Sequence, residues 1–84
     1  MYKVVWKTKA KKQLAQLDRI LAEKIRDKVA AYLALDPYNY GEPLSYEYQG
    51  LYRYRFSDYR VVYEVKENEL IVLILKVGHR REIY

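Results

Sequence analysis

Hydrophobic and polar residues alternate at the start of the chain. Tyr2, Val4 and Trp6 occupy every second position of residues 2–7, between two lysines and a valine. Successive side chains of a strand point to opposite faces, so this period of two predicts a half-buried strand with one face against the core.

Two helices are predicted after this strand. Thr8 and Asp18 are N-cap candidates, because their side-chain oxygens can accept hydrogen bonds from the first free N–H groups of a helix. The first helix is expected from Thr8 to near Asp18 and the second from Asp18 to Leu35, where Asp36-Pro37 ends it. Apolar residues at spacings of three and four predict the buried face of the second helix: Leu21, Ile25, Val29, Tyr32 and Leu33.

The rest of the chain divides into a connector and three strands. Residues 38–50 contain four tyrosines and no regular period, so a functional loop and a strap over the core are both open interpretations. Short turns then separate three strands, at Leu51–Phe56, Tyr59–Val65 and Leu70–Val77. We expect a single α+β domain over residues 1–84: an N-terminal strand, a helix hairpin and a three-strand antiparallel meander, with the helices on one face of the sheet.

Composition narrows the class of protein. The 84 residues include no cysteine, which excludes disulfide scaffolds and thiol catalysis and favours the cytoplasm. No apolar run is long enough to span a bilayer and the N-terminus has no signal-peptide pattern, so neither export nor contact with a membrane is expected.

Positive charge exceeds negative charge and is unevenly distributed. Sixteen Lys and Arg against eleven Asp and Glu give a net charge of +5, which favours an acidic partner such as nucleic acid. The first seventeen residues hold five lysines and no acid. These lysines are predicted either to contact RNA or to form a solvated edge: Lys3, Lys7, Lys9, Lys11 and Lys12.

Three arginines are predicted to share the sheet face opposite the helices. Alternation turns Arg53 and Arg55 away from the core, and a symmetric turn at Ser57-Asp58 brings Arg60 opposite Arg55. Like charges directly opposite each other are destabilising, which favours a bound anion, and the planar guanidinium suits phosphate. Alternatively the arginines reach into solvent or pair with nearby carboxylates, namely Glu47, Glu64 and Asp58.

The same face also carries apolar residues, because the last strand is apolar on both sides. An apolar surface beside a basic cluster suits a protein partner as well as nucleic acid. The predicted patch consists of Leu51, Val62, Ile71, Leu73 and Leu75.

The C-terminal residues add titratable groups beside this face. His79 is the only histidine, and its ordinary pKa suits proton transfer near neutral pH, although a surface role is equally open. Arg80, Arg81 and Tyr84 follow it. Gly78, just before them, is expected to bend the strand or redirect its side chains.

Three segments resemble the RelE-type branch of the RelE/ParE toxin superfamily: Gly50–Phe56, Asp58–Val65 and Val77–Tyr84. The opening strand and helix hairpin resemble it as well. Toxins of that branch are ribosome-dependent endoribonucleases that cut mRNA in the A site, and each is neutralised by a cognate antitoxin. The resemblance implies that this chain is such a toxin, with mRNA on the ribosome and an antitoxin bound on the apolar patch as its partners, and with no metal or cofactor.

The resemblance also implies residue roles. A ribose 2′-hydroxyl would attack the adjacent phosphate, which needs a base, cations for the developing charge and an acid for the leaving oxygen. Arg53, Arg55 and Arg60 would surround the phosphate, Arg80 would stabilise or protonate the leaving oxygen, and Tyr84 would stack on a nucleotide. Other relatives carry lysines where this chain has Arg53 and Arg55, and an arginine is too strongly protonated to be an easy base.

The sequence therefore does not decide which residue is the general base and which is the general acid. Glu47 as base and His79 as acid form one candidate pair, and Arg81 is a further candidate RNA contact. Two other functions compete: a ParE-like toxin that inhibits DNA gyrase, and an RNA-binding relative without catalysis.

Overall fold

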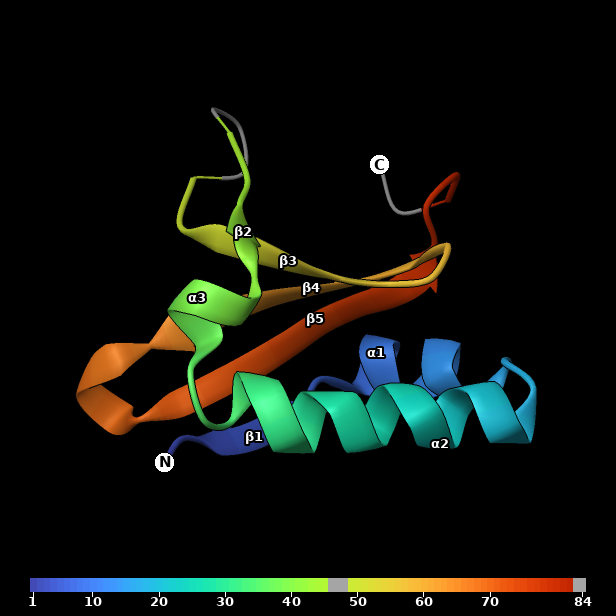
Figure 1. Cartoon of the computed structure of the whole chain (residues 1–84), viewed down its shortest axis with the longest axis horizontal. Helices are drawn as coiled ribbons and strands as arrows, with labels where there is room; N and C mark the ends of the chain where they lie inside the picture. Colours follow the sequence, from blue (N-terminus) through green and yellow to red (C-terminus); the bar gives the residue numbers. More distant parts are fainter. Residues whose placement is uncertain (46–48, 83–84) are drawn as a thin grey trace.

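The computed structural model describes residues 1–45 and 49–82. Five strands form one mixed sheet (Figure 1). Across the sheet the strands follow the order β1-β5-β4-β3-β2; β1 runs parallel to β5, and the other neighbours are antiparallel. The predicted meander is confirmed, and the N-terminal strand pairs with the last strand of that meander. The strand bounds are β1 Lys3–Trp6, β2 Glu42–Pro43, β3 Leu51–Phe56, β4 Tyr59–Lys66 and β5 Ile71–His79.

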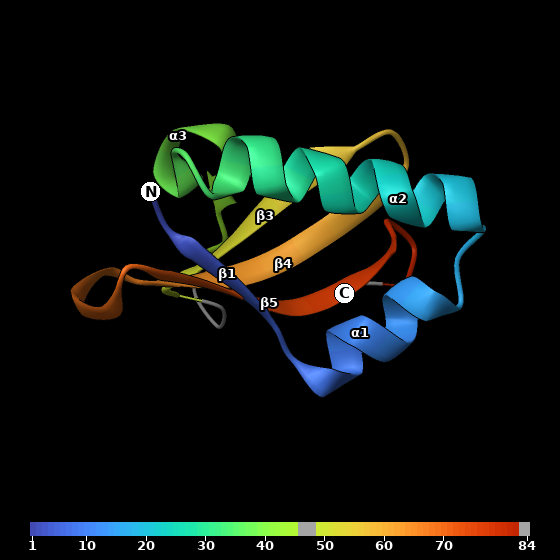
Figure 2. The same ribbon diagram turned by 90° about the horizontal axis from the view of Figure 1, so that it is seen from below.

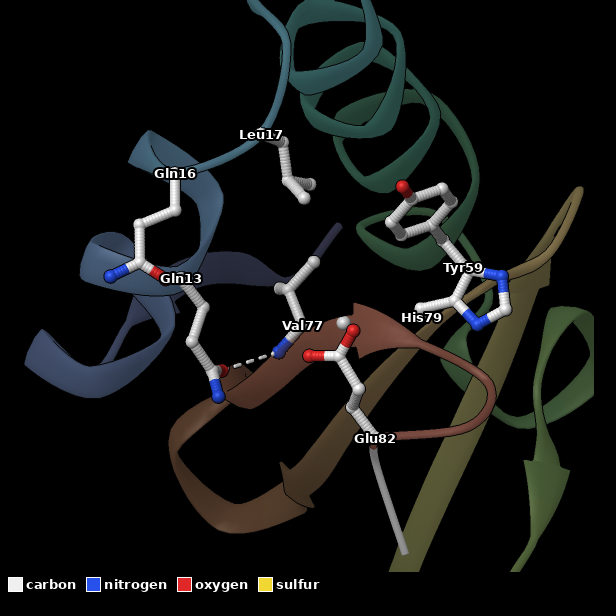
Figure 3. Close-up of a pocket in the computed structure, with 8 residues that line it drawn as sticks. Gln13, Gln16, Leu17, Tyr59, Val77, His79 and Glu82 are labelled. Atoms are coloured by element: carbon white, nitrogen blue, oxygen red, sulfur yellow. Dashed lines mark hydrogen bonds between the residues drawn. The ribbon is translucent and has the colours of Figure 1, made fainter.

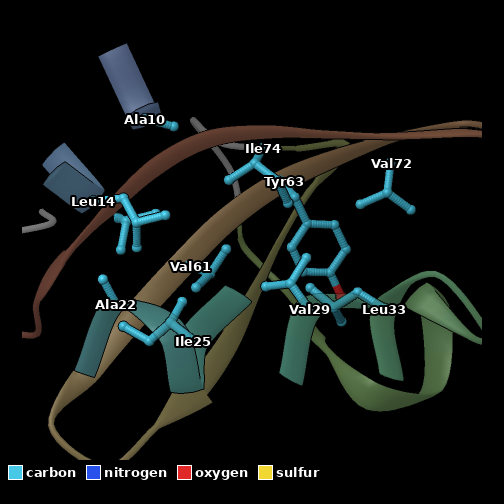
Figure 4. Close-up of a cluster of buried hydrophobic side chains, with 11 residues drawn as sticks. Ala10, Leu14, Ala22, Ile25, Val29, Leu33, Val61, Tyr63, Val72 and Ile74 are labelled. Atoms are coloured by element: carbon cyan, nitrogen blue, oxygen red, sulfur yellow. The ribbon is translucent and has the colours of Figure 1, made fainter. Parts of the chain in front are cut away.

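The helices α1 (Thr8–Ala15) and α2 (Arg19–Lys28) lie across one face of the sheet, as predicted (Figures 1 and 2). A π-helical turn, Val29–Leu33, continues α2. Its geometry differs from the expected α-helix, because the N–H of Ala34 donates to the carbonyl of Val29, five residues back, at 3.1 Å. The core lies between these helices and the sheet (Figure 4) and includes Ile25, Val29, Leu33, Val61, Tyr63, Val72 and Ile74.

The two predicted helix caps have different outcomes. Asp18 caps α2, because its carboxylate accepts hydrogen bonds from the N–H groups of Ile20 and Leu21 at 3.1 and 3.3 Å. The prediction that Thr8 caps the first helix is wrong, because Lys7 occupies the N-cap position of α1 and makes no side-chain cap bond. The N–H of Lys7 donates to the carbonyl of Ile74 at 3.0 Å, so pairing with β5 fixes the entry to α1.

The connector is more regular than expected. A short helix, α3 (Pro37–Tyr40), begins where Asp36 accepts from the N–H of Asn39, and β2 follows it. The buried hydroxyl of Tyr63 donates to the carbonyl of Pro37 at 2.6 Å and ties α3 to the core. Gly41 lets this hydroxyl approach, since a Cβ there would lie 1.7 Å from it. Elements this short have no period for a sequence pattern to show.

A β-bulge interrupts the pairing of β4 with β5. Val62 pairs with Lys76 and Tyr63 with Ile74, which leaves Leu75 as the extra residue. The bulge turns Val77 into the core, where it is 1% exposed. The bend expected at Gly78 is not observed, because β5 continues through that residue to His79.

Candidate functional site

The arginines of the β3–β4 hairpin lie on the sheet face opposite the helices. Arg55 pairs directly with Arg60, and Arg53 pairs with Val62, so the predicted register is confirmed. The aromatic residues that alternate with these arginines pack against the core on the other face: Tyr52, Tyr54, Phe56 and Tyr59. Two rows of residues across the sheet therefore bring the three arginines together.

Glu42, on β2, is the carboxylate that meets two of these arginines. It lies 2.9 Å from Arg55 and 3.6 Å from Arg53, measured between carboxylate oxygens and guanidinium nitrogens. The side chains of Glu42 and Arg55 are half exposed, and that of Arg53 is more buried. Sequence patterns missed this contact, because β2 has two residues and its pairing with β3 comes from the tertiary fold.

The guanidinium of Arg60 turns toward the end of the hairpin. Its Nη1 donates to the carbonyls of Ser57 and Tyr59 at 3.1 and 3.0 Å. Ser57 has a φ of 55°, a left-handed conformation that costs a non-glycine residue energy and is frequent at functional sites. The tight turn thus holds Arg60 in place.

Arg80 comes to the same end of the sheet. Its N–H donates to the carbonyl of Asp58 at 2.8 Å, and its guanidinium lies 3.8 Å from the Asp58 carboxylate. Figure 1 shows the residues after β5 beside the turn between β3 and β4. The structure therefore brings Arg60 and Arg80 to one turn, next to the pair that Glu42 holds.

Lys76 also belongs to this face, although the sequence pattern did not predict it. It pairs with Val62, which pairs on its other side with Arg53. Residues directly opposite each other in an antiparallel ladder share a face. We call the set Arg53, Arg55, Arg60 and Lys76 the cationic face.

His79 lies on the other side of the sheet. It pairs with Tyr59, and the two rings meet edge to face with centroids 5.5 Å apart. Both line a cavity of about 280 Å³ beside α1 (Figure 3). The Nδ1 of His79 accepts the N–H of Arg81 at 3.2 Å, which leaves Nε2 as the donor of a neutral ring. The structure does not bring His79 to the cationic face.

α1 contributes an amide to the same cavity. Gln13 accepts the N–H of Val77 at 2.8 Å through its side-chain oxygen, and Gln16, Leu17 and Glu82 complete the lining (Figure 3). The Gln13 bond ties the helix to β5 just beyond the bulge. It therefore fixes the strand that carries Lys76 and His79.

The remaining predicted site residues are spread more widely. Glu47 and Tyr84 lie outside the described residues. Arg81 is exposed, close to His79. The N-terminal lysines are exposed along β1 and α1, at Lys3, Lys7, Lys9, Lys11 and Lys12.

The apolar patch is smaller than predicted. Leu51 and Leu73 both pair with Glu64, and Ile71 lies further along β5; all three leucine and isoleucine side chains are partly exposed. Val62 shares the face but is only 4% exposed, which corrects its assignment as a contact residue. Leu75 is partly exposed and is the bulge residue.

A second polar cluster lies at the opposite end of β4 and β5. Glu67 accepts hydrogen bonds from the hydroxyls of Tyr2 and Tyr38 at 2.6 and 2.8 Å. These bonds lower the pKa of Glu67 and raise the pKa of Tyr2 to about 12. They join the start of β1, α3 and the turn Glu67–Glu69. We call Tyr2, Tyr38 and Glu67 the tyrosine clasp.

Comparison with known proteins gives consistent relatives. Residues 4–84 match the family described as the ParE toxin of the type II toxin–antitoxin system parDE. Toxin RelG of Mycobacterium tuberculosis is 30% identical over 83 residues, which cover 99% of this chain and 95% of that toxin. No helix within residues 1–45 and 49–82 has the length and apolar character that a membrane crossing requires.

Solved structures share the fold. The toxin–antitoxin complex RelBE2 from Mycobacterium tuberculosis contains a chain that matches with a TM-score of 0.89 and 29% identity, over 94% of this chain and 98% of that one. The isolated E. coli RelE toxin matches with a TM-score of 0.78 and 21% identity, over 94% of this chain and 84% of that one. The α+β fold predicted from the sequence is therefore confirmed. Together with the family match, these likenesses show that the chain belongs to the RelE/ParE superfamily of toxins from type II toxin–antitoxin systems.

Proposed function

We propose that this toxin is a ribosome-dependent endoribonuclease that cleaves mRNA and so inhibits translation in the cytoplasm. The observation that supports this proposal is the convergence of four arginines around one hairpin. Arg55 lies opposite Arg60 in the β3–β4 ladder, Arg53 lies on the same face opposite Val62, and Arg80 reaches the turn of that ladder. Guanidinium groups bind phosphate through paired hydrogen bonds and stay charged at physiological pH.

The reaction is an internal transfer at phosphorus. The ribose 2′-oxygen loses its proton to a base and attacks the adjacent phosphate, the bond from phosphorus to the 5′-oxygen breaks, and that oxygen gains a proton. The products are a 2′,3′-cyclic phosphate and a 5′-hydroxyl. Arg53, Arg55 and Arg60 stabilise the extra negative charge of the transition state, and Arg80 stabilises the leaving oxygen. When the phosphate binds, it displaces the Glu42 carboxylate from Arg53 and Arg55.

The base and the acid are proposed separately. Arginine is a poor base because of its high pKa, so Glu47 remains the proposed base and Tyr84 the proposed nucleotide contact. His79 remains a candidate acid, although its ring lies beside Tyr59 on the helix side of the sheet. To act on the cationic face it would have to move around the end of β5.

The products of programmed ribosomes test the proposal. Ribosomes carrying a defined mRNA, incubated with the protein, should yield fragments with cyclic-phosphate and 5′-hydroxyl ends. In the same single-turnover assay, His79→Ala and Glu47→Ala should each lower the rate by about 10²-fold if they carry protons. Intact mRNA at a large excess of protein would overturn the proposal.

A gyrase inhibitor is the second candidate, and the matching family description supports it because it names ParE. A gyrase-binding toxin has no need for a ring of guanidinium groups around a phosphate. Gyrase-dependent DNA breaks, together with intact mRNA, would favour this candidate over the ribonuclease.

A cognate antitoxin is the proposed regulatory partner, in a toxin–antitoxin complex like the RelBE2 complex that the fold matches. Its proposed contacts are the partly exposed apolar side chains beside the cationic face, namely Leu51, Ile71, Leu73 and Leu75. Addition of the antitoxin should stop cleavage in the programmed-ribosome assay, and continued cleavage at excess antitoxin would contradict this role.

A further inference from the structure

The bulge at Leu75 decides which way Lys76 points. Upstream of the bulge, Val72 and Ile74 face the core, and unbroken alternation would turn Lys76 toward the core as well. One inserted residue reverses the faces of everything that follows. Val77 therefore becomes the core residue, and Lys76 pairs with Val62 on the cationic face.

The cationic face consists of two parallel rows. One row runs Arg55, Arg60, Gly78 and the other runs Arg53, Val62, Lys76, each across β3, β4 and β5. The rows are two residues apart along β4, so about 6.6 Å separates them. Lys76 and Arg53 lie two strand spacings apart, roughly 10 Å. This spacing allows two phosphates of one strand to bind at once.

Lys76 has a free positive charge within the described part of the chain. No ion pair involves it there, whereas Lys66, on the same face, lies 3.7 Å from Glu64. Val62 separates Lys76 from Arg53 and is 4% exposed. In the second row, Lys76 and Arg53 therefore lie on either side of Val62, a small apolar residue that is already buried.

We propose that Lys76 forms a second phosphate subsite, which binds the phosphodiester of single-stranded RNA next to the one held by the hairpin arginines. This inference rests on the proposed function, because it takes RNA as the ligand of the cationic face. Lys76 acts as a positioning residue: it sets the register of the RNA strand and leaves the reacting phosphate to Arg53, Arg55 and Arg60. A lysine suits this role, because an ammonium acts as a point charge without a fixed fork.

The salt dependence of RNA binding tests the subsite. The probe is a short single-stranded RNA with a 2′-deoxy nucleotide at the cleavage position, titrated at several salt concentrations by fluorescence anisotropy. Loss of one phosphate contact in Lys76→Met should reduce the slope of log K against log salt by about 0.7. Lys76→Arg should restore the slope, and Lys24→Met, an exposed lysine of α2 on the helix side, should leave it unchanged.

A linkage scan identifies the phosphate. In a series of these oligonucleotides, each with one neutral methylphosphonate linkage, the Lys76→Met effect should vanish for the linkage next to the cleavage position. Wild-type slopes in Lys76→Met, or an equal effect at every linkage, would overturn the subsite. Cleavage by programmed ribosomes with wild-type slopes in Lys76→Met would reject the subsite but keep the proposed function. A Lys76-dependent slope without cleavage would do the reverse.

Discussion

At the cationic face, charged groups meet charged groups, whereas in the tyrosine clasp one carboxylate is held by two neutral hydroxyls. Glu42 contacts Arg53 and Arg55, and the side chains of Glu42 and Arg55 are half exposed. Water or a ligand can replace such exposed ion pairs at little cost in free energy. Glu67 instead receives short hydrogen bonds from two tyrosines of distant segments. Both sites are exposed, so the difference lies in what they connect: Glu42 pairs with arginines of the adjacent strand, and Glu67 links segments that are distant in the sequence.

The largest expected effect is on activity, at the cationic face. Arg60→Ala should lower cleavage by programmed ribosomes by about 10²–10³-fold, because it removes one preorganised donor to the transition-state charge. Arg19→Ala, an exposed arginine of α2, is the matched control and should cleave normally. Circular dichroism and thermal unfolding should show the same fold in both variants. Full activity of Arg60→Ala would place the phosphate elsewhere.

A moderate effect on stability is expected at the tyrosine clasp. The folded pKa of Glu67 lies below the ordinary value of 4.5. Its contribution to stability is therefore complete above that value and is lost as the pH falls through the folded pKa. Glu67→Gln should lower the thermal midpoint at neutral pH, and the difference from wild type should shrink in acid.

Glu69→Gln, in the same turn, is the control for the clasp and should show no comparable loss at neutral pH. At the alkaline end the sign reverses. Tyr2 has a folded pKa of about 12, raised from 10, so its contribution is complete below 10 and is lost as the pH rises through about 12. If the difference in thermal midpoint between wild type and Glu67→Gln did not change with pH, this would contradict the stabilising role of the clasp.

The smallest effect is expected at Glu42. Glu42→Gln should tighten binding of the uncleavable RNA by up to about fivefold, because a competing carboxylate worth at most about 1 kcal/mol is removed. Glu23→Gln, an exposed acid of α2, makes the same charge change on the helix side. Weaker RNA binding in Glu42→Gln would mean that Glu42 orients the arginines and does not compete for them.

Sequence patterns predicted the parts of the molecule that have a strong period. The alternation of β3 and β4 placed Tyr52 and Tyr54 toward the core, and the two-residue turn fixed Arg55 opposite Arg60. The spacing of α2 predicted Ile25 as a buried residue, and Asp18 was recognisable as a cap.

The missed features lack such a signal. Residues 70–75 are apolar at every position, so a bulge at Leu75 changes no pattern, although it determines the direction of Lys76. The contact of Glu42 depends on a two-residue strand that only the assembled sheet defines. The side of the sheet on which His79 lies likewise follows from the bulge and not from local alternation.

The position of β5 has a consequence for how the toxin folds. Among the described residues it is the last strand in sequence, yet it lies between β1 and β4. Until residues 71–79 are in place, β1 has no partner strand and α1 has no β5 to pack on. Contacts between the two ends of a chain close late and slow its folding. The pairing of β1 with β5 therefore closes late in folding, and the contact of Arg80 with the β3–β4 turn, which follows β5, is completed with it.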